Sequence, residues 1–126
     1  MRSTQKLALA SVVASVFVLT VSDAAIAHAL LVKAVPAVGG AISAAPPEIK
    51  ITFSEAVEPR FSGIAVKGAD GRAVATAAAS VDPADHATLI VPVKAALQPG
   101  TYKVSWHVVS IDTHATQGGF SFEVKP

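Results

Sequence analysis

Residues 98–108 decide the fold, and they read QPGTYKVSWHV. After the Pro-Gly pair, polar and apolar residues alternate, which is the pattern of a β-strand with one face in a hydrophobic core. That face carries Tyr102, Val104, Trp106 and Val108. The pattern therefore predicts a strand over residues 101–111 that packs one of its sides against the core.

The rest of the chain repeats this pattern in shorter pieces, separated by Pro, Gly and Asp turns. The further strands that we expect cover residues 30–34, 48–53, 64–67, 73–75, 88–93 and 120–124. Asp70-Gly71 between two of these runs predicts a hairpin, and Pro92 predicts a sheet edge or a strand end. The alanine-rich residues 75–80 are also compatible with a helix, and so short a segment does not decide the matter.

Short strands at close spacing favour a sandwich or barrel of antiparallel strands. The turn before Tyr102, with Pro99 and Gly100, is similar to the tyrosine corner of immunoglobulin-like sandwiches. We therefore expect an all-β, immunoglobulin-like domain.

Residues 1–27 are predicted to be a signal peptide and not part of this fold. Arg2 and Lys6 precede an apolar stretch over residues 7–21, and residues 25–27 read Ala-Ile-Ala, as at a signal-peptidase site. The apolar stretch is short for a membrane span, which needs about 20 residues. The alternative is an uncleaved N-terminal anchor. Cleavage after Ala27 would leave residues 28–126 as one exported domain.

Composition excludes several functional classes. The absence of cysteine excludes disulfides, zinc–thiolate sites, iron–sulfur sites and thiol chemistry. Basic and acidic side chains balance in residues 28–126 and form no basic run, so neither nucleic acid nor an anionic lipid surface would find a complementary patch. The length suits a single domain with its own core, and we expect a monomer.

His28 would become the first residue after cleavage. An N-terminal histidine offers a metal ion its α-amine and its ring Nδ1 together. The ordinary pKa of the amine is about 7.7–8.0, so a metal can displace its proton near neutral pH. The alternative is that histidine follows the cleavage site by chance.

Asp112 and His114 form a second candidate pair of metal ligands. In an extended chain, side chains two residues apart point the same way, so a carboxylate and an imidazole at this spacing can close on one ion. The alternative is a polar loop that follows a strand.

Glu55 ends the alternating row of residues 49, 51 and 53, which faces the core. A carboxylate in that row must lie at the rim or have a partner, because burying it unpaired is costly. The topology brings the candidates together: His28 begins the first strand, Glu55 ends the second, and Asp112 and His114 follow the penultimate one. In an immunoglobulin-like sandwich these positions share one end of the domain.

The two other histidines are expected to be structural or exposed. His107 has the opposite parity to Trp106 and Val108, so it should face away from the core. His86 lies in the turn-like residues 82–86, with a weak exposed second metal site as the alternative.

The candidate ligands favour copper among the divalent metals. Imidazole, amine and carboxylate donors suit the tetragonal geometry of Cu(II), which also binds such sites more tightly than Zn(II). Residues 28–126 contain neither methionine nor cysteine, so the soft ligands of a Cu(I) site are absent.

Across residues 28–126 the sequence resembles the CopC family of periplasmic copper-resistance proteins. The resemblance rests on the leader followed by HALL at 28–31, on ITFSE at 51–55, PGTYKVSW at 99–106, VSIDTH at 109–114 and FSF at 120–122. It implies a seven-stranded Greek-key sandwich or barrel. It also implies a Cu(II) site made by the amine and ring of His28 with Asp112 and His114, where Glu55 is an axial ligand or lies just outside the ligands.

The resemblance further implies a periplasmic carrier or buffer of copper that passes the metal to an inner-membrane protein of the CopD type. The sequence departs from the family in two places. The methionine-rich Cu(I) loop of some members is absent, and Ala115 stands where many members have proline. An enzymatic alternative is a copper monooxygenase, which uses the same N-terminal histidine chelate but needs exposed aromatic residues to bind sugar.

Overall fold

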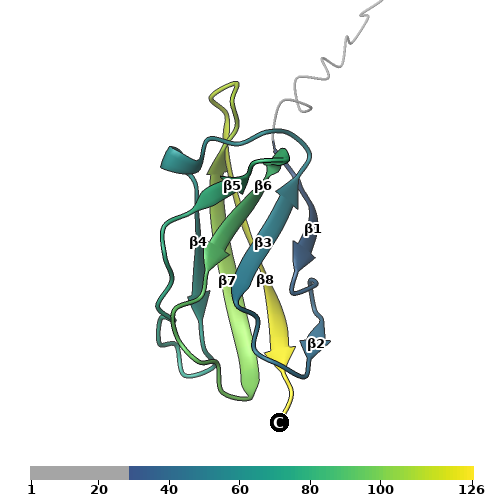
Figure 1. The fold of residues 1–126 in the computed structure, drawn as a ribbon, viewed down its shortest axis with the longest axis vertical. Coiled ribbons are helices and arrows are strands. Elements are labelled where there is room, and N and C mark those ends of the chain that lie inside the picture. Colours follow the sequence, from purple (N-terminus) through teal and green to yellow (C-terminus); the bar gives the residue numbers. More distant parts are fainter. Residues whose placement is uncertain (1–28) are drawn as a thin grey trace, which may run out of the picture.

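The computed structural model of the protein describes residues 29–126, so the predicted leader and His28 lie outside the described residues. Within residues 29–126 the chain forms eight strands and one 3-10 turn (Figure 1). They are β1 (Leu31–Val35), β2 (Ala41–Ile42), β3 (Glu48–Phe53), η2 (Pro59–Phe61), β4 (Gly63–Lys67), β5 (Ser80–Asp82), β6 (Asp85–Pro92), β7 (Gly100–Val109) and β8 (Ala115–Val124).

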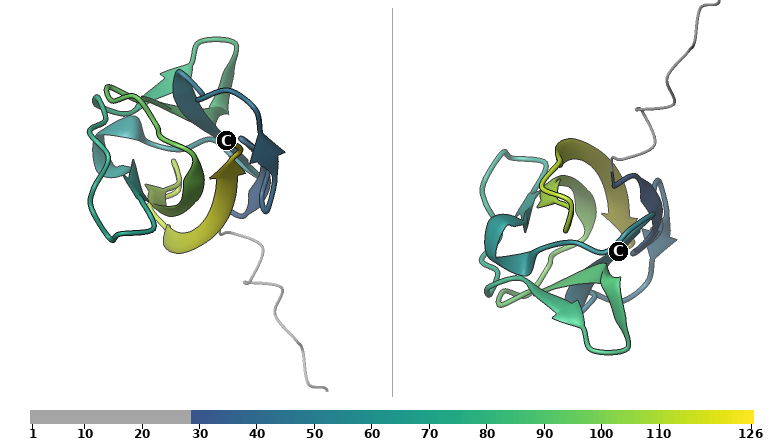
Figure 2. Two further views of the ribbon diagram at one scale, coloured as in Figure 1. Left: turned by 90° about the horizontal axis from the view of Figure 1, so that it is seen from below. Right: turned by 90° about the horizontal axis from the view of Figure 1, so that it is seen from above.

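The strands of residues 29–126 form two four-stranded sheets, in the orders β1-β3-β6-β5 and β2-β8-β7-β4, that enclose the core (Figure 2). Paired strands run antiparallel, except that β2 adds to β8 in parallel. The prediction of an all-β sandwich is confirmed. The strand count differs from seven because the sequence pattern missed the very short β2 and β5, while residues 73–75 contribute an isolated bridge between Ala73 and Lys67 and no strand.

Residues 98–108 contain most of β7, with the alternation of buried and exposed side chains that the sequence predicts. The predicted inward row of β7 is buried along its length, and the residues between its members are exposed. Trp106 meets Phe53 of the facing sheet edge to face, with ring centroids 5.0 Å apart. Aromatic pairs of this geometry stabilise a core beyond their buried area. The row from β7 therefore joins the two sheets.

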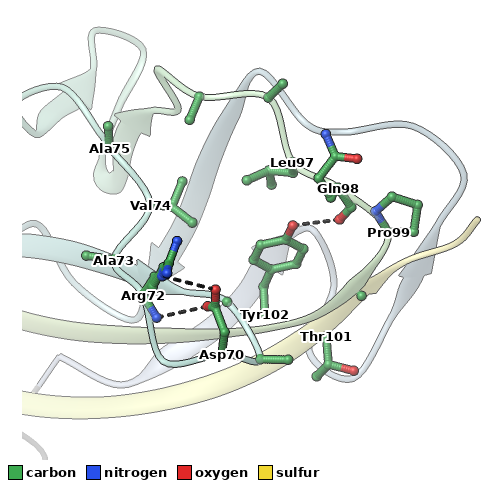
Figure 3. Close-up of a pocket in the computed structure, with 15 residues that line it drawn as sticks. Asp70, Arg72, Ala73, Val74, Ala75, Leu97, Gln98, Pro99, Thr101 and Tyr102 are labelled. Atoms are coloured by element: carbon green, nitrogen blue, oxygen red, sulfur yellow. Dashed lines mark hydrogen bonds and ion pairs between the residues drawn. The ribbon is translucent and has the colours of Figure 1, made fainter.

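The tyrosine corner also forms. The Tyr102 hydroxyl donates a hydrogen bond of 2.6 Å to the backbone oxygen of Gln98, at a hollow between residues 68–75 and 95–102 (Figure 3). The Asp70-Gly71 turn is present as well. Gly71 has φ +80, and the Asp70 carboxylate accepts a hydrogen bond of 3.0 Å from the Arg72 backbone.

Two predictions left open are resolved. Pro92 is the last residue of β6, which lies between β3 and β5, so it marks a strand end and not a sheet edge. Residues 75–80 form no helix, because their backbone bonds to the end of β6 and beyond: Ala77 donates to Pro92, and Ala75 accepts from Lys94. Across the described part of the chain, no helix is long and apolar enough to cross a membrane.

The direction of the strands determines where a site can lie. β3 and β7 both end at the end of the sandwich where β1 begins (Figure 1). The pairing of Leu31 with Phe53 fixes the first of these junctions.

Gly118 of β8 lies opposite Trp106, and a Cβ on Gly118 would come within 2.5 Å of the indole ring. We predict that Gly118→Ala lowers the free energy of unfolding by about 1–3 kcal/mol, because the buried ring has little space to move. Urea denaturation measures this change.

The matched control is Gly63→Ala. Its Cβ would approach the His107 ring, at 2.7 Å, but that ring is exposed and can turn into solvent. The control should change the free energy of unfolding by no more than about 0.5 kcal/mol. Equal losses in the two variants would contradict the packing described for Trp106.

Candidate metal site at one end of the sandwich

Three segments meet where β1 begins. The Leu30 backbone N–H donates to the Ser54 hydroxyl at 2.9 Å, and the Ser54 N–H donates to the Leu30 carbonyl at 2.8 Å. The segment after β3 then crosses to the end of β7, where Ile111 N–H donates to Ala56 at 3.2 Å and Glu58 N–H donates to Val109 at 2.8 Å. Backbone hydrogen bonds therefore join the start of β1, the segment after β3 and the loop after β7.

The loop after β7 is a tight turn. The Thr113 N–H donates to the Ser110 carbonyl at 2.8 Å, and the Ser110 N–H donates to the His114 carbonyl at 2.9 Å. Thr113 has φ +75, as in hairpin loops that combine a type I turn with a left-handed residue. For a β-branched residue this conformation costs about 1–3 kcal/mol, so the neighbouring contacts must hold it.

Asp112 and His114 meet, although not for the reason that we gave from the sequence. The expectation of an extended chain is wrong, because Thr113 reverses the chain direction. The turn nevertheless brings Asp112 Oδ1 to 3.2 Å from His114 Nδ1, with side chains that are 39% and 50% exposed. A carboxylate and an imidazole therefore stand side by side at an accessible surface.

The Asp112 carboxylate is held in its ionised form. The Ser110 hydroxyl donates to Oδ1 and is the main cause of a lowered pKa of Asp112, followed by hydrogen bonds from the backbone and side chain of His114 and by its charge. Partial burial opposes this effect. A lowered pKa keeps the carboxylate negative at neutral and mildly acidic pH, as a metal ligand requires.

Glu55 lies at the rim of the core, as its place in the β3 row predicts. It is half-buried, and its Oε1 is buried without a hydrogen-bond partner among the described residues. Its neighbours Ser54 and Ala56 carry the backbone bonds to Leu30 and Ile111, so Glu55 lies between β1 and the Asp112 loop. A buried carboxylate oxygen without a partner is costly, and a nearby cation or donor would offset that cost.

The two other described histidines, His86 and His107, are both exposed. His107 is exposed on the outer face of its sheet, as its parity predicts, and its ring lies over Gly63. His86 is exposed near the start of β6. Taken over residues 29–126, no three His, Asp or Glu side chains gather closely enough to hold a metal ion. The described residues thus bring two donors together, Asp112 and His114, and do not group Glu55 with them.

Ser110 is the contributor that we missed. It is fully buried, and it continues the inward row of Trp106 and Val108 beyond the strand. A serine in a core-facing row two residues before an aspartate was the available signal, since a buried hydroxyl needs a partner.

The fold and the site define a class: a small immunoglobulin-like β-sandwich with a carboxylate–imidazole pair at the end where the chain enters. The model of the CopC domain family matches residues 31–125, and the chain belongs to the CopC family.

Several known proteins are similar to the chain. Protein YobA of Escherichia coli K12 is 44% identical over 99 residues, which span 79% of this chain and 80% of YobA. The crystal structure of PcoC, described as a methionine-rich copper resistance protein from Escherichia coli, superposes with a TM-score of 0.69 at 34% identity, over 79% of this chain and 100% of PcoC.

A third relative is a much longer protein. Copper transport protein CutJ of Bacillus subtilis is 30% identical over 108 residues, which span 86% of this chain but 20% of CutJ. PcoC and CutJ are named for copper resistance and copper transport, and none of the three names denotes an enzyme.

Proposed function

We propose that the exported chain, residues 28–126, is a periplasmic Cu(II)-binding protein that carries or buffers one copper ion in copper homeostasis and resistance. The ligands are the amine and ring of His28 with Asp112 and His114, and Glu55 is an axial ligand or lies just outside the ligands. The observation that carries this proposal is the Asp112–His114 pair. Its oxygen and nitrogen are 3.2 Å apart at the end of the sandwich where β1 begins.

This separation suits two neighbouring ligands of one ion. Metal–nitrogen and metal–oxygen bonds of about 2.0–2.1 Å at a right angle place their donor atoms roughly 3 Å apart. The pair therefore needs little rearrangement to bind, and the negative carboxylate attracts the cation before binding.

The position of Ala29 supports a role for His28. Ala29 is fully buried, and its carbonyl accepts a hydrogen bond of 2.8 Å from Thr116 Oγ1, two residues beyond His114. Consecutive Cα atoms are about 3.8 Å apart, so a chain that began at His28 would start next to this anchored residue. Its amine and imidazole would add two donors to the pair that Asp112 and His114 form.

The donor set favours Cu(II) over Cu(I) and Zn(II). Nitrogen and oxygen donors suit tetragonal Cu(II), and residues 28–126 contain no methionine or cysteine for Cu(I). PcoC, by contrast, is described as methionine-rich. We therefore infer a Cu(II)-specific protein within a family whose members differ in sulfur content.

We infer that the chain passes its copper ion to a membrane protein and does not turn over a substrate. CutJ carries a segment similar to this chain within a much longer copper transport protein, which supports transfer of copper from this chain to a CopD-type inner-membrane protein. The carrier acts as a monomer. A monooxygenase is disfavoured because Trp106 and Tyr102 are buried in the core. Phe61 is the one exposed aromatic side chain among residues 29–126, and a single ring does not make a flat aromatic surface for a sugar.

The ligand assignment predicts how variants of the mature protein behave. Asp112→Ala or His114→Ala should weaken Cu(II) binding by orders of magnitude, because each removes a donor. Glu55→Gln should cost about 10–100-fold, as for a group next to the ligands. Competition titration against a chelator measures these losses. His107→Ala is the control, since its ring is exposed on the outer face of β7, away from the core; a loss as large as that of Asp112→Ala would refute the assignment.

The role of the terminus yields a separate prediction. One glycine added before His28 replaces the amine by an amide, a far poorer donor at neutral pH, and leaves the imidazole in place. Cu(II) affinity should fall sharply and the electron paramagnetic resonance spectrum should change. The native-terminus protein is the control, and its start at His28 is verified by mass spectrometry. Identical affinities and spectra would remove the amine from the ligand set.

A further inference from the structure

Ser110 is a fully buried serine, 0% exposed, in the turn that carries Asp112 and His114. Its hydroxyl donates to Asp112 Oδ1 and lies 3.1 Å from the His114 carbonyl oxygen. Its backbone bonds to Thr113 and to His114 close the turn. Every polar group of Ser110 is thus used on the loop that presents the two donors.

We propose that Ser110 is a positioning residue for copper. Its hydroxyl holds the Asp112 carboxylate against His114, so that the oxygen and nitrogen donors are neighbours before the metal arrives. This inference rests on the proposed function of the Asp112–His114 pair. Nothing in the family match or in the names of the relatives assigns such a role.

Ser110 is buried, whereas the Asp112 side chain that its hydroxyl contacts is partly exposed. The Asp112 side chain is 39% exposed on a turn, where a carboxylate without a donor would sample several rotamers. Ser110, in contrast, follows Val108 in the buried row and bridges to Val57 of the segment after β3. Fixing the carboxylate from this side lowers the entropy that metal binding must otherwise remove.

The Ser110 hydroxyl donates to Asp112 Oδ1 but is not itself one of the proposed metal ligands. The His114 ring is the other side-chain partner of Oδ1, and a ring nitrogen that binds the metal no longer donates to that oxygen. Oδ1 accepts from the Ser110 hydroxyl and, at 3.2 Å, from the His114 backbone N–H. The carboxylate has about four lone-pair sites on its two oxygens, so it can keep both of these bonds and still bind the metal. The serine contact therefore persists in the copper-bound state and orients the carboxylate.

The test uses the mature protein that starts at His28. Ser110→Ala should weaken Cu(II) binding by about 10–100-fold, as for loss of a group that orients a ligand, and should shift the electron paramagnetic resonance spectrum. Ser110→Thr keeps the hydroxyl and should retain the wild-type spectrum.

Ser62→Ala is the matched control. Ser62 is also buried, at 9% exposed, and its hydroxyl accepts a hydrogen bond of 3.0 Å from Val109 N–H, one residue before Ser110. Removing it should lower the melting temperature, because Val109 loses its acceptor, and should leave copper affinity and spectrum unchanged.

Several outcomes would overturn the proposal. They are wild-type affinity and spectrum in Ser110→Ala, an equal loss of affinity in Ser62→Ala, or, if the alanine variant fails to fold, a folded Ser110→Thr protein with a changed spectrum. Asp112→Ala is measured in parallel. If that variant keeps full affinity, the proposed site itself is wrong, whereas loss in Asp112→Ala without loss in Ser110→Ala rejects only the role of Ser110.

Discussion

The structure depends on one constraint: every second residue of β7 must enter the core between the sheets. That constraint buries Trp106 and Val108 and turns His107 outward. It also carries the inward row one step past the strand, to Ser110, which is the only fully buried polar residue in the described part of the chain. A buried hydroxyl must find a partner, and the nearest acceptors belong to the turn that follows. Core packing and the geometry of the candidate site are thus parts of the same strand pattern.

The fold is largely predictable from the sequence because its signals are local and periodic. The alternation in β3 and β7, the Pro-Gly turn before Tyr102 and the Asp70-Gly71 turn all act over a few residues, and all are present. The second strand of the predicted hairpin, residues 73–75, is reduced to a bridge between Ala73 and Lys67. β2 was not predictable, since Ala41 and Ile42 form a strand only by lying beside the end of β8. Residues 75–80 were undecided for the same reason, because long-range hydrogen bonds determine their conformation.

The candidate site was predictable in its location but not in its detail. Strand directions sufficed to bring the Asp112 loop and Glu55 to one end of the sandwich. The positive φ of Thr113 was not predictable, because threonine rarely adopts it and only the bonds around Ser110 reveal why it does so here. The position of Glu55 Oε1, buried without a hydrogen-bond partner among residues 29–126, likewise follows from three-dimensional packing. In the proposed site the folded domain provides half of the ligands and the processed terminus provides the rest, so copper binding would begin only after export and cleavage.

The most direct measurement is a crystal structure of the mature protein, beginning at His28 and loaded with Cu(II), with anomalous data collected at the copper edge. One strong peak per chain should lie within about 2.0–2.1 Å of a carboxylate oxygen of Asp112 and a ring nitrogen of His114, with the His28 amine also bonded to the ion. A peak at His86 or His107, or a copper ion that contacts neither Asp112 nor His114, would contradict the proposed site.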